Sequence, residues 1–89
     1  MKTAKSIVLT IGDTDFEFSP TVNDHNNYTN DMMPDNKVAP AYTFLTRTVK
    51  SEQKDALKVL LDTVPSLVME VFMTVNKAAK GGITVSLKN

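Results

Sequence analysis

The residue closest in type to a catalytic or metal-binding group is His25, the chain's one histidine, which follows Asp24 and precedes Asp31. Imidazole titrates near neutral pH, so a histidine among carboxylates could act as a general base or as a metal ligand. Neighbouring residues of a helix point to different faces, and no second histidine is available to complete such a site. We therefore interpret His25 as a partly exposed helix residue near Tyr28.

The acidic residues and glycines of the sequence also do not form the motif of a calcium or phosphate-binding site. Asp13, Asp15 and Glu17 do not form the twelve-residue calcium loop with its central glycine and terminal glutamate. The two glycines at 81–82 precede a β-branched segment and not a helix, which is unlike a phosphate-binding loop. Because the chain has no cysteine, thiolate catalysis, disulfides and cysteine-ligated metal centres are excluded. The sequence predicts no catalytic, cofactor-binding or metal-binding residue and no enzyme activity, which leaves protein binding as the expected role.

The charge balance narrows the class of partner. Ten basic and ten acidic residues give a formal net charge of zero. Nucleic-acid-binding domains carry a basic excess that neutralises phosphate, so nucleic acid is not the expected partner. A net charge near zero also removes the long-range repulsion between copies, which favours a homo-oligomer. No apolar stretch has the length of a signal peptide or of a membrane span, so no membrane partner is expected.

The elements that would position any functional residue indicate an α+β fold, with one domain over residues 1–89. A β-hairpin is expected over about 5–18, because β-branched residues precede a glycine turn and Phe16-Glu17-Phe18 alternates behind it. A C-terminal strand is expected over about 83–88, where apolar and polar residues alternate again. Since an unpaired strand leaves an exposed edge, we expect this strand to join the hairpin in a small sheet.

About four short helices are expected between 21 and 80. The first covers about 22–33 and is rich in asparagine and aspartate, so it needs tertiary support. The second covers about 38–49, where apolar residues recur at helical spacing: Val38, Ala41, Tyr42, Leu45 and Val49. The third follows Ser51, and the fourth begins at Pro65 and ends before the glycines at 81–82.

The fourth helix has more apolar surface than one buried side requires. A first stripe is formed by Val68, Val71, Phe72, Val75 and Ala79. Met69 and Met73, two of the chain's five methionines, widen this stripe. Methionine fills gaps in cores and also forms adaptable binding surfaces. We therefore expect the helix to bury two sides, one of them against a partner or another copy.

Residues 30–49, with Met-Met-Pro at 32–34 and Val-Ala-Pro at 38–40, resemble a family of phage tail assembly chaperones. Three other parts of the chain fit the same family: the hairpin that ends in Phe16-Glu17-Phe18, the aromatic residue Tyr28, and Lys-Asp-Ala-Leu at 54–57. The resemblance therefore covers nearly the whole chain. It implies a chaperone in the host bacterial cytoplasm that coats the coiled-coil-rich tape measure protein and delivers it to tail tube subunits.

That role would make an apolar helical groove the working surface. The predicted protein-binding residues are Met32, Met33, Met69, Phe72 and Met73. Two other functions stay open: a small virion tail or connector protein, and a nucleic-acid-associated phage regulator. The regulator would need a continuous basic face from Arg47, Lys50, Lys54 and Lys58, although acidic residues interleave with them.

Overall fold

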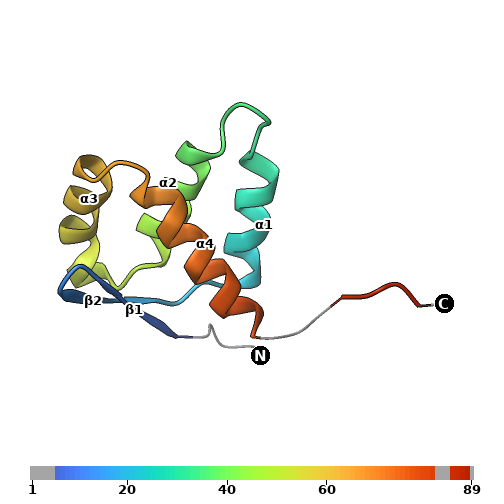
Figure 1. The fold of residues 1–89 in the computed structure, drawn as a ribbon, viewed down its shortest axis with the longest axis horizontal. Helices are drawn as coiled ribbons and strands as arrows, with labels where there is room; N and C mark the ends of the chain where they lie inside the picture. The colour runs from blue at the N-terminus through green and yellow to red at the C-terminus, as the bar shows by residue number, and fades with distance from the viewer. Residues whose placement is uncertain (1–5, 82–84, 89) are drawn as a thin grey trace.

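The computed structural model describes residues 6–81 and 85–88 and has the expected α+β composition, with a hairpin and four α-helices in this part of the chain. Figure 1 shows the hairpin along one edge of the helices, with α1 and α3 on opposite sides and α4 crossing between them. The elements in chain order are β1 (Ile7–Ile11), β2 (Thr14–Phe18), α1 (Val22–Asp31), α2 (Val38–Thr48), the 3-10 turn η1 (Ser51–Gln53), α3 (Lys54–Thr63) and α4 (Leu67–Lys80).

The predicted hairpin is confirmed. Its strands are antiparallel, with Ile7 opposite Phe18, and they are joined by the two-residue loop Gly12-Asp13. Gly12 has a φ of 68°, a left-handed conformation that glycine adopts without the steric cost of a Cβ atom. Alternation turns Ile7, Phe16 and Phe18 to the helices, where all three side chains are buried.

The outer edge of β2 is closed by the segment that follows α2. The Lys50 backbone N–H donates to the Glu17 carbonyl at 2.8 Å. The Gln53 side chain accepts from the Glu17 N–H and donates to the Asp15 carbonyl, each at 2.8 Å. These bonds satisfy backbone groups that an edge strand would otherwise leave open, and they fix the hairpin to the helices.

The predicted C-terminal strand does not join the sheet. Among the described residues the sheet has the two strands β1 and β2, and residues 85–88 are in neither a helix nor a strand. Residues 83 and 84 lie outside the described part. Val85 and Leu87 are 88% and 89% exposed, and Figure 1 shows this segment leading away from the hairpin. The expectation of an in-chain third strand is wrong for residues 85–88, because the β2 edge is already closed and the segment does not return to β1.

α1 is a well-capped helix with little burial of its own. The Thr21 hydroxyl accepts the Asp24 N–H at 3.2 Å, and the Asp24 carboxylate accepts the Thr21 N–H at 2.9 Å, a reciprocal capping box. The helix ends at Asp31, because Met33 and Asn36 exchange backbone hydrogen bonds across a tight turn that contains a proline. α1 has no buried residue, and its tertiary contacts come from the half-buried Tyr28 and His25, whose rings pack on Phe72 and Phe44.

α2 is the centre of the helical layer and packs against α1, α3 and α4. At the other end of the chain, α4 begins at Leu67 and not at Pro65, because Ser66 turns the backbone with a φ of 64°. Burying the apolar faces of these elements together is the main favourable contribution to folding. The resulting core is Ile7, Phe16, Phe18, Ala41, Phe44, Leu45, Val49, Leu57, Leu61, Val68, Val71, Phe72 and Val75.

A polar contact between α2 and α3 predicts a specific pH dependence. Burial, then a hydrogen bond to Asp62 and its negative charge, raises the pKa of Tyr42 above its ordinary value of 10.0. A pKa raised by folding gives stabilisation that is present below the unfolded-state value and is lost as pH rises through the folded-state value. We therefore expect the free energy of unfolding to fall above about pH 10, and to fall less in Tyr42→Phe. Urea unfolding between about pH 8 and about pH 11 measures this, and identical pH profiles for the two proteins would contradict it.

Candidate protein-binding surface

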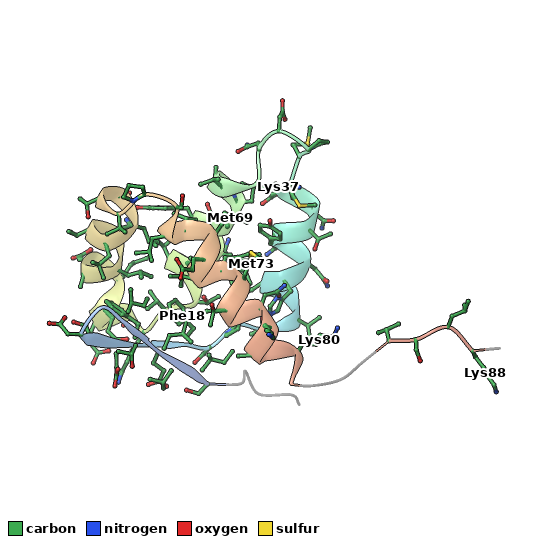
Figure 2. The ribbon with its side chains drawn as sticks, in the orientation of Figure 1. Phe18, Lys37, Met69, Met73, Lys80 and Lys88 are labelled. Carbon is green, nitrogen blue, oxygen red and sulfur yellow. The ribbon has the colours of Figure 1, made fainter. Side chains whose placement is uncertain are left out.

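α4 has a buried apolar side and a second, more exposed side that carries two methionines and two polar residues. The first is buried in the core and consists of Val68, Val71, Phe72 and Val75. The second consists of Met69, Met73, Asn76 and Lys80, whose spacing of four, three and four residues keeps them on one side of the helix. We call this second side the α4 outer face. Met69 is half-buried, whereas Met73 is 63% exposed, and Figure 2 shows Met73 between α4 and α1.

An apolar hollow lies at each end of the α4 outer face. The hollow beside Met69 has a volume of about 430 Å³ and is lined mainly by Val38, Leu61, Val64, Pro65, Val68 and Met69. The hollow at the other end has a volume of about 320 Å³ and is lined by Val22, His25, Asn76, Ala79 and Lys80. From Met69 to Lys80 the helix rises about 16 Å, or three turns, at 1.5 Å per residue.

An aromatic cluster forms the floor beneath this surface. The Phe72 ring lies 4.3 Å from the Tyr28 ring of α1 and 5.1 Å from the Phe44 ring of α2. The His25 ring lies 4.9 Å from Phe44. Phe72 is only 5% exposed, so it supports the surface from below and joins three helices. His25 is half-buried on α1, and its ring packs on an aromatic neighbour.

The structure brings some of the predicted contact residues together and separates others. Met69 and Met73 lie one turn apart on the α4 outer face, whereas Phe72 belongs to the buried side of the same helix. Met32 and Met33 are exposed, but they belong to the end of α1 and the turn before α2. The hollows are completed by exposed valines that the sequence analysis did not select, namely Val22, Val38 and Val64. Each stands at a helix start or beside a proline, which was the available signal.

The surrounding charges are few and mixed. Asp62 lines the hollow beside Met69, and Lys80 lines the hollow at the opposite end. Between α1 and α2, Arg47 lines a cavity of about 20 Å³ together with Asp24 and Asp31. Arg47 therefore has acidic side chains of α1 beside it in this cavity. That arrangement weakens the argument for nucleic-acid binding.

Neither a cluster of metal-binding side chains nor a membrane-spanning helix is found among the residues that the structure describes. In that part of the chain, no three or more histidine and acidic side chains gather closely enough to hold a metal ion. Within the same residues, no helix is long and apolar enough to cross a membrane.

The chain as a whole is similar to known proteins. A family model described as phage tail assembly chaperone matches residues 7–89. An uncharacterized 11.3 kDa protein from the lys 3' region of Haemophilus phage HP1 (strain HP1c1) is 31% identical over 84 residues, which are 94% of this chain and 81% of that protein. No solved structure matches the chain. The family match confirms the resemblance carried by residues 30–49, and the chain belongs to the phage tail assembly chaperone family.

Proposed function

We propose that this protein is a non-catalytic chaperone of tail assembly that binds a helical segment of the tape measure protein on the α4 outer face. It would act in the host cytoplasm and release the tape measure protein to tail tube subunits. The observation that carries the proposal is the position of Met69 and Met73. They extend α4's apolar surface outward beyond the valines and Phe72 that already fill the core.

The geometry suits a helical client. A helix that lies in a groove anchors itself through apolar residues spaced by three, four and seven positions. Hollows at both ends of a three-turn face can accept two such anchors, while Met73 contacts the residues between them. Methionine has a flexible, polarizable side chain, so one surface can repack against successive segments of a long client. We propose that Met32 and Met33, which follow the C-terminus of α1, extend the contact with the client.

The charges at the two ends favour one direction for the client. The N-terminus of a helix carries partial positive charge and its C-terminus partial negative charge. Asp62 lies at the Met69 end and Lys80 at the opposite end. A client helix that runs parallel to α4 would place both of its ends beside a charge of opposite sign.

The direct test is Met73→Glu. Because the side chain is 63% exposed, the change should leave the free energy of unfolding within about 0.5 kcal/mol of the wild type. A carboxylate placed in an apolar interface loses its hydration without a partner, so we expect affinity for a tape measure segment to fall at least about tenfold. Calorimetric titration of the purified segment into each protein measures the dissociation constant.

Val59→Glu is the matched control. Val59 lies on α3, has nearly the same exposure as Met73 at 62%, and receives the same charged residue. We expect its dissociation constant to stay within about twofold of the wild type. Unchanged binding in Met73→Glu, or an equal loss in both variants, would remove the α4 outer face as the binding site.

A further inference from the structure

The two edges of the hairpin differ in their backbone hydrogen bonding, because the β2 edge is bonded to the segment after α2 and the β1 edge is not. In a hairpin with a two-residue loop, pairs of residues that exchange hydrogen bonds alternate with pairs whose backbone groups point outward. On β2 the outward groups are those of Asp15 and Glu17, because these bond to Gln53 and Lys50. Their partners across the hairpin are Thr10 and Val8, which must therefore point their backbone groups to the other edge. Nothing in the described part of the chain pairs with that β1 edge.

A hollow of mixed lining lies beside this open edge, with the polar side chains of Thr10, Glu70 and Thr74 around its apolar residues. Its volume is about 230 Å³, and it lies between β1 and α4, with Leu9 and Ile11 on one side and Leu67 and Val71 on the other. Leu9 and Ile11 are only half-buried, although they share the inward side of the strand with the buried Ile7. A further strand with apolar residues on its inward side would cover all four side chains.

The chain carries a segment with that pattern. In residues 85–88, Val85 and Leu87 alternate with Ser86 and Lys88, and the two apolar side chains are 88% and 89% exposed. Extended at about 3.3 Å per residue, four residues span about 13 Å, most of the length of a five-residue strand. The charges also match, because residues 6–18 contain Asp13, Asp15 and Glu17 and no basic residue, whereas Lys88 is the charged side chain of the segment.

We propose that residues 85–88 of one copy add as a strand to the open β1 edge of a second copy, with Val85 and Leu87 entering the hollow beside α4. A second copy is the occupant because the segment leads away from its own hairpin (Figure 1) and because zero net charge permits close approach of copies. Main-chain bonds to Val8 and Thr10 would hold the strand, as in other cases of strand addition. Each copy has one donor segment and one acceptor edge, so copies associate head to tail.

The test compares Val85→Asp with Ser86→Asp in the full chain. Both add one negative charge to a segment outside the core, but only the first places it on the inward side of the added strand. We expect Val85→Asp to raise the dissociation constant for self-association at least about tenfold, and Ser86→Asp to change it by no more than about twofold. Sedimentation velocity over a range of protein concentrations measures both constants. Equal behaviour of the two variants, or a monomeric wild type at every concentration, overturns the proposal.

Amide exchange identifies the occupant. Strand addition between copies should slow exchange at Val8 and Thr10 about tenfold or more as concentration rises, and Val85→Asp should abolish the effect. Protection that does not depend on concentration would mean that the segment folds back on its own β1 edge, which overturns assignment to a second copy. These outcomes do not depend on Met73, so failure here is separable from failure of client binding.

Discussion

Phe72→Ala is expected to lower the free energy of unfolding by about 3–5 kcal/mol, the usual cost of removing a buried phenylalanine. For 89 residues the total stability is on the order of 4–13 kcal/mol, at about 0.05–0.15 kcal/mol per residue, so the change consumes much of it. The loss has two sources, namely the cavity left among the valines of α4 and the ring contacts with Tyr28 and Phe44. Each aromatic pair adds about 0.5–1.5 kcal/mol beyond its buried area.

Met73→Ala is the matched control for this prediction. It shortens the neighbouring side chain of the same helix, but that side chain is 63% exposed and not 5% exposed. We expect it to change the free energy of unfolding by less than about 0.5 kcal/mol. Urea unfolding followed by circular dichroism gives both values. Similar midpoints for the two variants would contradict the placement of Phe72 in the core.

The effect of Phe72→Ala should also be uneven along the chain. α1 has no buried residue, and its ring contacts are those of Tyr28 on Phe72 and His25 on Phe44. Removing the Phe72 ring therefore removes one of two aromatic attachments of this helix. Amide exchange in α1 should accelerate more than exchange in α2.

The position of α1 bears on the proposed function. Val22 and His25 of α1 form one wall of the hollow at the Lys80 end of the α4 outer face. A helix that is well capped but shallowly packed can shift without breaking its own hydrogen bonds. A shift of α1 would therefore change the width of this hollow.

Residue patterns that are local in sequence predicted much of this fold. The hairpin followed from β-branched residues on both sides of a glycine turn, and α4 followed from apolar residues at helical spacing. The inner face of α4 was predicted correctly because Val68, Phe72 and Val75 all meet the same core. In α2 the pattern was less complete. Phe44 is buried, because α2 packs against helices on several sides and its buried face is wider than one stripe. Val38 is exposed and is the first residue of the helix.

Features that depend on contacts between distant residues could not be predicted. Gln53 bonds to the backbone of Asp15, 38 residues away, and no local pattern marks a glutamine as the residue that closes a sheet edge. Because the sequence does not show that the β2 edge is closed, it could not show that residues 85–88 have no place there. Their alternation favoured a strand without indicating where that strand could pair. The candidate site likewise has a part that local spacing predicts and a part that depends on contacts between distant residues. Met69 and Met73 follow from helical spacing, whereas the hollows require Val22, Val38 and Val64 to come together from different elements with α4.

Phe18→Ala should lower the free energy of unfolding by a similar amount, about 3–5 kcal/mol, but through a different part of the molecule. Phe18 is 0% exposed, ends β2 and bridges to Val49 after α2. It lies opposite Ile7 in the hairpin, so its ring joins both strands to the helical core. An isolated two-stranded hairpin is marginally stable in water, and we expect the hairpin to detach before the helices unfold. Amide exchange should therefore be fastest in β1 and β2.

Val8→Ala separates this effect from a general weakening of the hairpin. Val8 belongs to the same strand as Ile7 but points to solvent and is 59% exposed, so its truncation should cost less than about 0.5 kcal/mol. If Phe18→Ala proves too unstable to purify, Phe18→Leu keeps most of the buried volume and should cost about 1.5 kcal/mol or less. We expect the urea midpoint to be highest for Val8→Ala, lower for Phe18→Leu and lowest for Phe18→Ala. Hairpin amides that stay as protected in Phe18→Ala as in Val8→Ala would show that the Gln53 and Lys50 bonds, and not the Phe18 ring, hold the hairpin in place.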